Sequence, residues 1–239
     1  MAQQRAAIVT GASSGIGLAI AEVLGEEGYA LTVAARRPEK LEAAASGLRD
    51  KGFDVEVVAG ALGDEEGVKA VVAAHRERYG RLDVLINNAG VGIGAAVAEI
   101  DTKKLDLQLG VNLRSIILFY RETVDLLRAA AAEHGTALVV NTASIAGKRG
   151  QPWVSVYSAT KGAVINFTEA MHKELSGEGI KSTALCPGFV DTPMTEFAKG
   201  SVPAEEMITP RDIGEAVRLL LKVSPACIIP EIQFLRAGD

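Results

Sequence analysis

The feature that most constrains the fold of this 239-residue sequence is a regular alternation of short apolar runs with longer stretches of helical periodicity. Six runs lie at about 5–10, 30–35, 54–59, 83–87, 137–142 and 181–185, and a weaker seventh lies at about 227–234. The runs are continuous in Val, Ile, Leu and Ala, as expected of strands that helices cover on both sides. The alternation predicts an α/β fold with a parallel sheet between two layers of helices.

No linker divides this pattern. The sequence has no Pro/Gly/Ser-rich spacer, low-complexity tract or internal repeat, and its 48% hydrophobic residues suffice for one large core. We therefore expect a single domain over residues 1–239. Segments 89–100 and about 187–208 are predicted to be loops at strand ends, where binding sites are commonly built.

Composition and charge exclude several classes of function. The net charge of −5, with no run of Lys or Arg longer than two residues, argues against a nucleic-acid partner. No apolar stretch is long enough to cross a membrane, and the apolar pattern begins near Ala6, so we expect no signal peptide and a cytoplasmic location. The two cysteines, Cys186 and Cys227, imply no disulfide framework, and the three scattered histidines predict no metal site.

A glycine-rich turn, Thr-Gly-Ala-Ser-Ser-Gly-Ile-Gly, follows the first run at 10–17 and opens a helix at Leu18. Glycines let a backbone approach a pyrophosphate closely, and a helix N-terminus offers free amides to an anion. The turn lacks the Lys of the ATPase loop, which disfavours ATP hydrolysis. It predicts phosphate binding, with a plain strand-to-helix turn as the alternative. The candidate contacts are Gly11, Ser13, Ser14, Gly15, Ile16 and Gly17.

The end of the second run bears on which nucleotide would bind. Dinucleotide folds that take NAD usually have an acidic residue there, whereas an arginine suits the additional phosphate of NADP. Here Arg36 and Arg37 follow Ala35, and no acidic residue is present. We therefore expect NADP(H) to be preferred, with NAD(H) possible and two solvated loop arginines as the alternative.

Tyr157 and Lys161 are four residues apart in a stretch of helical periodicity, and Ser144 lies thirteen residues before Tyr157. Lowering the pKa of a tyrosine from ~10 to ~7 requires roughly 4 kcal/mol, which one ammonium at about 4 to 5 Å supplies at an effective dielectric constant of ~20. The pair could therefore serve as a proton donor without a metal. A plain surface pair is the alternative.

Six motifs then occur in order along nearly the whole chain. They are the turn at 10–17, Asn87-Asn88-Ala89-Gly90, Asn112, Ser144, Tyr157-Ser158-Ala159-Thr160-Lys161 and Pro187-Gly188-Phe189-Val190-Asp191-Thr192. This ordered set resembles the short-chain dehydrogenase/reductase family. The resemblance implies a doubly wound, Rossmann-type sheet of seven parallel strands with helices on both faces, and a nicotinamide cofactor.

The resemblance also implies a catalytic tetrad and a reaction, the NADP(H)-dependent interconversion of a ketone and a secondary alcohol by hydride transfer. Tyr157 would be the general acid or base, and Ser144 would hold the carbonyl oxygen. Lys161 would lower the Tyr157 pKa and bind the nicotinamide ribose. Asn112 would help to hold a water that links Lys161 to solvent, or would serve only in helix packing.

Further residues are assigned to the cofactor by the same resemblance: Asn88, Ala89, Gly90, Pro187, Gly188, Val190 and Thr192. The first three would lie against the adenosine ribose, and Asn88 would also tie the central strands together. The others would surround the nicotinamide, with Thr192 on its carboxamide or on a phosphate. The chain departs from the family at Ala61, where an adenine-binding Asp is usual, so the backbone of Leu62 would take that contact alone. The C-terminal glycine pattern of many members is also missing.

The substrate pocket is expected between segments 91–98, 145–154 and 189–208. Its candidate lining residues are mostly apolar: Ile93, Ile145, Trp153, Phe189, Met194 and Phe197. They favour an uncharged or partly apolar small-molecule ketone, although Lys148 and Arg149 could meet an acidic tail.

The stretches at about 103–132 and 152–177 carry apolar residues on more than one helical face. In the family such helices pair across subunits, so a homotetramer or dimer is expected. A non-catalytic NADP(H)-binding regulator or a scaffold on the same fold is the alternative function. The intact Ser144, Tyr157 and Lys161 argue against the regulator, and Arg36 and the glycine turn argue against the scaffold.

Overall fold

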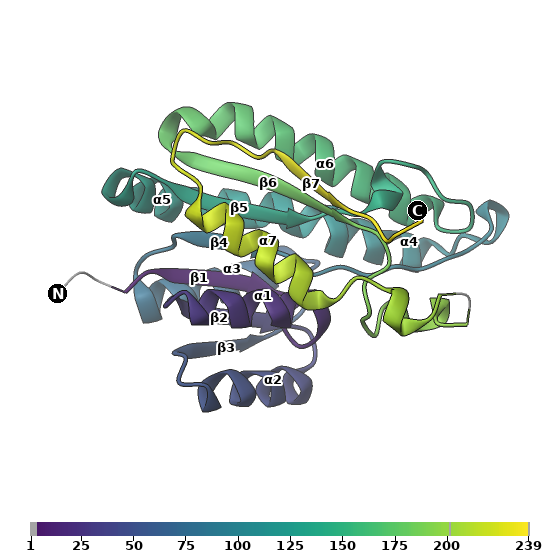
Figure 1. Cartoon of the computed structure of the whole chain (residues 1–239), viewed down its shortest axis with the longest axis horizontal. Helices are drawn as coiled ribbons and strands as arrows, with labels where there is room; N and C mark the ends of the chain where they lie inside the picture. The colour runs from purple at the N-terminus through teal and green to yellow at the C-terminus, as the bar shows by residue number, and fades with distance from the viewer. Residues whose placement is uncertain (1–3, 201, 239) are drawn as a thin grey trace.

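The computed structural model describes residues 4–200 and 202–238. Positions 1–3 and 239 of the expected domain, and position 201 of the expected 187–208 loop, lie outside the described residues. Seven parallel strands form one sheet in the order β3-β2-β1-β4-β5-β6-β7 (Figure 1). The strands are β1 (Ala6–Thr10), β2 (Ala30–Ala35), β3 (Val55–Ala59), β4 (Val84–Asn87), β5 (Ala137–Thr142), β6 (Ile180–Pro187) and β7 (Glu231–Phe234). All seven predicted runs are confirmed, although β7 begins later than expected.

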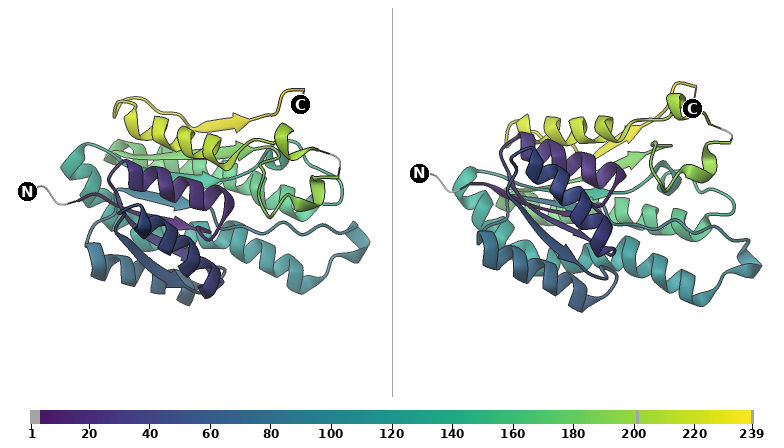
Figure 2. Two further views of the ribbon diagram at one scale, coloured as in Figure 1. Left: turned by 60° about the horizontal axis from the view of Figure 1, so that its bottom comes forward. Right: turned by 90° about the horizontal axis from the view of Figure 1, so that it is seen from below.

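Helices cover both faces of the sheet (Figure 2). One layer consists of α1 (Gly15–Glu26), α2 (Pro38–Asp50) and α7 (Pro210–Lys222). The other consists of α3 (Glu65–Tyr79), α5 (Ser115–His134) and α6 (Ser155–Leu175), with α4 (Thr102–Leu109) leading into α5. The predicted doubly wound fold is thus confirmed. Short 3₁₀ turns lie at Val97–Glu99, Ile145–Gly147, Ser176–Glu178, Glu196–Ala198 and Ala204–Glu206.

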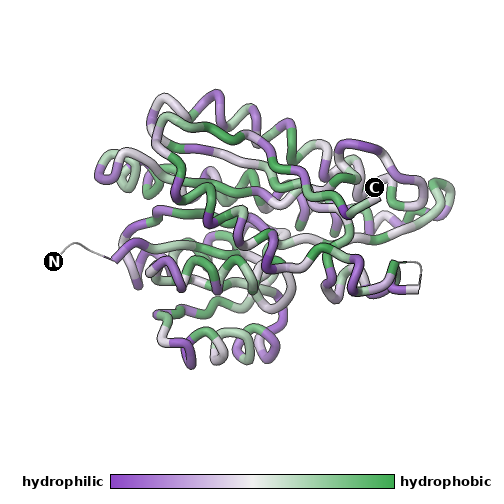
Figure 3. Tube along the Cα trace, viewed as in Figure 1, coloured by the Kyte–Doolittle hydropathy of each residue, from purple (hydrophilic) through white to green (hydrophobic). Residues whose placement is uncertain are grey.

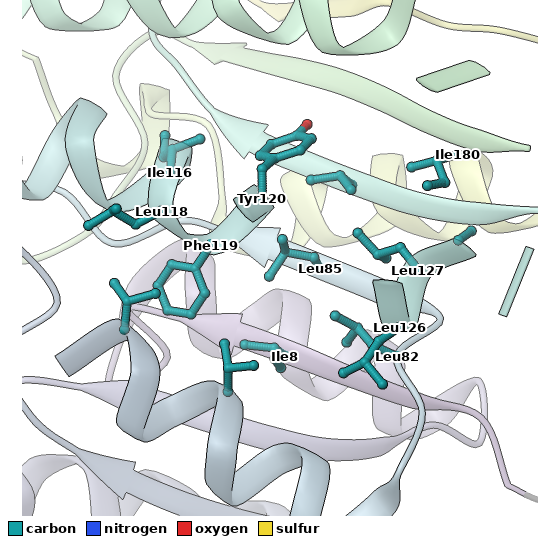
Figure 4. Packing of buried hydrophobic residues seen from close by; sticks show 14 of the residues in the cluster. Ile8, Leu82, Leu85, Ile116, Leu118, Phe119, Tyr120, Leu126, Leu127 and Ile180 are labelled. Carbon is teal, nitrogen blue, oxygen red and sulfur yellow. The ribbon is translucent and has the colours of Figure 1, made fainter. Parts of the chain in front are cut away.

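Two apolar cores, one on each side of the sheet, explain the continuous apolar runs in the sequence. Every residue of β1, β2 and β5 is buried, so both faces of these strands must be apolar or internally bonded. Coloured by hydropathy, the Cα trace shows apolar residues mainly along the inner strands (Figure 3). In one core, Phe119 and Leu127 of α5 pack with Leu85 and Ile8 of the sheet (Figure 4). Within the described ranges no helix is long and apolar enough to cross a membrane.

The predicted helical stretch at 103–132 is interrupted by a π-helical turn. Between α4 and α5, residues Gly110–Arg114 follow the wider i→i+5 spacing. The turn contains Asn112, whose side chain is completely buried. Wide turns of this kind often occur at functional sites because they redirect a side chain locally.

Strands β1 and β4 are parallel neighbours in the centre of the sheet. Successive strands are added in one direction from β1 and in the opposite direction from β4. In open parallel sheets the crevice for a ligand opens beside the carboxyl ends of the strands at such a point. The turn at 10–17 follows β1, segment 88–96 follows β4, and Ser144 follows β5. The fold therefore gathers three of the predicted motifs at one edge.

Candidate active site

Ser144 lies at the carboxyl end of β5, where it caps the short turn Ile145–Gly147. Its Oγ accepts a hydrogen bond from the amide of Ala146 at 3.1 Å and donates to the carbonyl of Pro187 at 3.4 Å. Because a hydroxyl oxygen has two lone pairs and one proton, the Oγ can exchange the long bond to Pro187 for a better acceptor. Ser144 thus both shapes the loop and presents a donor at the edge of the sheet.

Tyr157 lies in the first turn of α6, with its side chain close to Ser144 and Gly92. Burial raises the pKa of the phenol above its usual value of 10, and the hydrogen bond with Ser144 only partly opposes this shift. A phenol with a raised pKa remains protonated at neutral pH. The phenol of Tyr157 therefore carries its proton at neutral pH in this structure.

The expected lowering of the Tyr157 pKa by Lys161 is not found among the described side chains. The Lys161 ammonium lies 5.7 Å from the centre of the Tyr157 ring and bonds the carbonyl of Thr142 at 2.6 Å. Lys161 is only 3% exposed, and burial lowers its own pKa from 10.5 to about 8. Burial therefore dominates the protonation of both groups.

Asn112 joins the loop after β4 to helix α6. Its Oδ1 accepts from the amide of Val91 at 2.8 Å, and its Nδ2 donates to the carbonyl of Val91 at 2.9 Å and to Thr160 Oγ1 at 3.1 Å. Thr160 Oγ1 in turn donates to the carbonyl of Tyr157 at 2.8 Å. Asn112 is thus fixed by protein partners.

Gly90 lies beside two polar groups at the base of this site, the ammonium of Lys161 and the side-chain amide of Asn112. A Cβ added to Gly90 would lie 3.4 Å from Lys161 Nζ and 3.5 Å from Asn112 Oδ1. Any side chain at position 90 would therefore lie in van der Waals contact with both groups. The four predicted tetrad residues therefore surround one locus at the sheet edge.

The glycine turn has the geometry of an anion cradle. Gly11 and Gly15 have φ angles of 69° and 56°, which residues with a Cβ rarely adopt. A Cβ on Gly17 would clash with the carbonyl oxygen of Gly11, so helix α1 approaches the turn closely. Ser14 precedes α1 without a side-chain cap, which leaves the first amides of the helix for another acceptor. The turn fits the phosphates of a dinucleotide.

Asn88 ties the central strands together, as expected. Its Nδ2 donates to the carbonyl of Thr10 at 3.2 Å, and its Oδ1 accepts from Thr142 Oγ1 at 3.2 Å. The backbone amides of Asn88 and Ala89 both donate to Thr10 Oγ1, at 2.9 and 3.0 Å. These bonds hold the ends of β1, β4 and β5 in a fixed arrangement beside the glycine turn.

Arg36 and Arg37 are both exposed where β2 ends, and within the described ranges neither forms an ion pair. Gly11 donates its amide to the carbonyl of Ala34 at 2.7 Å, which brings the end of β2 next to the glycine turn. The backbone positions of Arg36 and Arg37 therefore follow directly on the part of β2 that borders the turn. Leu62 is 5% exposed because its side chain joins the core, so its backbone is the part left for a ligand.

The segment after β6 reaches back over the glycine turn. Gly188 donates to the carbonyl of Phe234 at 2.9 Å, and Val190 forms an isolated bridge with Ile208. Thr192 lies directly against Gly15, since a Cβ added there would be 3.0 Å from Thr192 Cγ2. The predicted residues Pro187 to Thr192 are therefore brought together with the turn at 10–17.

The expected pocket residues divide into exposed and packed groups. Ile145 packs against the core. Lys148 forms an ion pair with Glu231 at 2.8 Å, which reduces its availability for an acidic substrate. In residues 4–200 and 202–238 no cluster of His, Cys, Asp or Glu is arranged to hold a metal ion. Four side chains remain substantially exposed: Trp153, Phe189, Met194 and Phe197.

Sequence reasoning overlooked several residues that build the site. The carbonyl of Thr142 accepts from Lys161 Nζ, the hydroxyl of Thr160 links Asn112 to the backbone of α6, and Gln108 is buried under the loop after β4. Thr160 stands in the motif at 157–161 but no role was assigned to it, and Thr142 and Gln108 belong to no predicted motif. The i, i+3 relation between Tyr157 and Thr160 is the one sequence signal that could have pointed to this network.

Comparison with known proteins then identifies the family. The family model described as short chain dehydrogenase matches residues 5–201. The chain belongs to the short chain dehydrogenase family. This short chain dehydrogenase is 37% identical to a putative ketoacyl reductase of Streptomyces coelicolor, over 93% of its own length and 92% of the relative's. It is 42% identical to the granaticin polyketide synthase putative ketoacyl reductase 1 of Streptomyces violaceoruber, over 80% of its own length and 69% of the relative's.

Solved structures resemble this short chain dehydrogenase over almost its whole length. A variant of actinorhodin polyketide ketoreductase with NADPH has a TM-score of 0.88 at 33% identity, with 98% of this chain and 97% of that chain covered. A 3-ketoacyl-(acyl-carrier-protein) reductase from Brucella melitensis complexed with NADH also has a TM-score of 0.88, at 27% identity and with 99% and 98% covered. Both nicotinamide nucleotides thus occur among its structural neighbours.

Proposed function

We propose that this short chain dehydrogenase is an NADP(H)-dependent oxidoreductase that interconverts a ketone and a secondary alcohol, with Tyr157 as the general acid or base. The observation that carries the proposal is the convergence of Ser144, Tyr157 and Lys161 beside the glycine turn at one edge of the sheet. A regulator that only bound the nucleotide would need the turn but not the buried phenol. The names of the ketoacyl reductase relatives support the same reaction class.

The cofactor would supply the hydride for reduction of the carbonyl carbon and accept it in the reverse direction. Its phosphates would bind the turn at 10–17, and the additional phosphate of NADP would bind Arg36 and Arg37. Gly90 would admit the nicotinamide ribose to Lys161, while Val190 and Thr192 would contact the carboxamide side.

The protein's own part is to control the proton. As negative charge develops on the carbonyl oxygen, Ser144 Oγ would donate a hydrogen bond to it. Tyr157 would transfer its phenolic proton to that oxygen, so that the O–H bond of the phenol breaks and the O–H bond of the alcohol forms. Burial raises the pKa of Tyr157, so the phenol carries the proton that the reducing direction requires, although it is then a weaker acid than a free phenol.

The decisive experiment is NADPH oxidation with a panel of ketones that includes 3-oxoacyl thioesters, cyclic ketones and ketoses. Tyr157→Phe is expected to reduce turnover by a factor of 10³ or more while NADPH still binds. Tyr79→Phe is the matched control, since Tyr79 lies on α3 and bonds Leu31 at 3.2 Å. Equal turnover by Tyr157→Phe and the parent would contradict the acid assignment. Absence of turnover with every ketone would favour the regulator or scaffold.

The nucleotide preference has its own test. Arg36→Ala is expected to weaken NADPH binding at least tenfold and to leave NADH binding nearly unchanged, because only the additional phosphate would meet the guanidinium. A parent enzyme that prefers NAD(H) tenfold in paired assays would overturn this part of the proposal. We further propose a small-molecule ketone as substrate, a cytoplasmic location and assembly as a homotetramer or dimer.

A further inference from the structure

Trp153 is the one residue other than glycine with a positive φ angle, 67°, among those that the structure describes. For a residue with a Cβ this left-handed backbone conformation is strained. Trp153 directly precedes the N-cap of α6 and lies four residues before Tyr157. Its side chain is nevertheless 59% exposed, so burial of the indole does not account for the strained backbone.

Contacts with the loop after β4 hold Trp153 in this conformation. Its carbonyl accepts a hydrogen bond from the amide of Ala95 at 2.7 Å. Its ring lies against Gly94, where an added Cβ would come within 2.5 Å of Cδ2 and Cζ3 of the indole. Since real Cβ atoms do not approach so closely, only glycine at position 94 permits this placement of the ring.

The loop itself is fixed at every second residue. Val91 is bonded through its amide and carbonyl to Asn112, and the amide of Ile93 donates to Gln108 Oε1 at 3.1 Å. Ala95 is bonded to Trp153. The side chains of Asn112 and Gln108 are 0% and 2% exposed, so these anchors are rigid parts of the core.

The two glycines between the anchors meet the two aromatic rings. A Cβ on Gly92 would lie 3.7 Å from Cδ2 of Tyr157, and Gly94 lies against Trp153. Two residues of chain span at most about 7 Å. The indole and the phenol therefore lie against neighbouring positions of one short, immobilised segment.

We propose that Trp153 is a specificity-determining residue, whose indole forms a side wall of the space in front of Tyr157. This inference rests on the proposed ketone reductase function. A flat, rigid ring in that place restricts the width of the ketone and the face that it presents to the hydride donor. The strained backbone and Gly94 serve to hold the ring there.

The first test uses the fact that Trp153 is the only tryptophan in the chain. Protein saturated with NADP⁺ is titrated with 4-tert-butylcyclohexanone, which cannot react with the oxidised cofactor, and indole emission is recorded. We expect a saturable change in indole emission whose midpoint equals the inhibition constant of the ketone. Inhibition by the ketone without a change in indole emission would contradict a side wall formed by Trp153. A saturable change in indole emission in a protein that reduces no ketone would support the position of Trp153 and contradict the proposed function.

The second test compares variants on cyclohexanone and 4-tert-butylcyclohexanone. Trp153→Gly accepts the positive φ angle without strain, so it removes the ring and keeps the fold. It is expected to raise kcat/KM for the bulky ketone relative to the small one by a factor of ten or more, and to change the cis-to-trans ratio of the alcohol, with unchanged NADPH affinity. The same two ratios in Trp153→Gly and the parent would overturn the proposal.

Gly94→Ala tests the position of the ring while leaving the indole in place. Its Cβ is expected to displace the indole, shift the emission maximum and change the alcohol ratio in the cofactor-bound enzyme. Gly47→Ala on α2 is the control, because a Cβ there meets nothing within 4 Å and its φ is not positive. A Gly94→Ala enzyme with parental emission and parental product ratio would count against the wall.

Discussion

Lys161 is the residue of the site whose buried charge is least compensated by bonds to the protein. A cation that is 3% exposed has lost most of its hydration, and the described structure returns one bond, from Nζ to the carbonyl of Thr142. The lowering of its pKa to about 8 measures that imbalance. Ribose hydroxyls at Gly90 would restore part of the lost hydration. The stability of the free protein is thus reduced at the place where the cofactor is proposed to bind.

This imbalance predicts that Lys161→Met stabilises the cofactor-free protein in a pH-dependent manner. The folded pKa of about 8 lies below the unfolded value of 10.5, so the unfolded chain binds more protons between these values and the parent gains stability as pH rises. The penalty is complete below pH 8. By this linkage the advantage of Met is on the order of 3 kcal/mol at pH 7 and about half of that or less at pH 9.5.

Chemical denaturation of both proteins at the two pH values measures the difference. Lys173→Met serves as the control because its side chain is 72% exposed on the same helix. A difference between Lys161→Met and the parent that is independent of pH would show that burial of the charge is not its cause. The same variant should lose NADPH affinity, which separates the site's function from its stability.

At the scale of elements, the strands could be predicted because their physical cause lies in local composition. Strands β1, β2 and β5 are buried on both faces, and a continuous apolar run is the direct consequence. The glycine turn could also be predicted from the sequence, since the φ angles of Gly11 and Gly15 favour residues without a Cβ. Both signals are contained within a few neighbouring residues.

The π-helical turn at Gly110–Arg114 could not be predicted in this way. It differs from an α-helix by one hydrogen-bond step, and its stabilisation comes from Val91 and Thr160, which are 21 and 48 residues away from Asn112. The contact of Trp153 with Gly94 is likewise a long-range one. Local propensity carries no information about such partners, so the motif residues were predicted without the network that positions them.

The π-helical turn leads to a prediction about the loop after β4. Asn112→Ala removes both bonds to Val91 and the bond to Thr160, leaving buried polar groups without partners. We expect a loss of roughly 2 to 3 kcal/mol in the free energy of unfolding and a fall in Tm of about 5 °C or more. Hydrogen exchange at the amides of Val91 and Ile93 should accelerate together with a loss of turnover.

Asn166→Ala is the control for that prediction, because Asn166 is exposed on α6 and bonds only the carbonyl of Gly162, at 3.1 Å. It should leave Tm within about 1 °C of the parent, as most surface substitutions do. Parental exchange rates at Val91 in Asn112→Ala would mean that the loop is held by other contacts. In that case the π-helical turn would not position the site.

At the scale of the whole molecule, two helical layers differ in what they expose. Helices α1 and α7 are joined by charged pairs, among them Arg211 with Glu26 at 2.7 Å and Lys222 with Glu27 at 3.2 Å. The stretch from α4 to α5 in the opposite layer instead exposes Leu107, Leu109 and Ile117, each by about 40%. Exposed apolar side chains of this kind are what a contact between subunits would cover.

Self-association through the α4–α5 stretch is therefore the prediction that belongs to the molecule as a whole. Ile117→Arg places a charge where a second copy would remove it from water, which disfavours the assembly without touching the core. Sedimentation velocity at micromolar concentration should show a homotetramer or dimer for the parent and a shift toward monomer for Ile117→Arg. Leu219→Arg on α7, where Leu219 is 52% exposed, should sediment like the parent. A monomeric parent would contradict the assembly, and an equal shift with both variants would place the contact on neither layer alone.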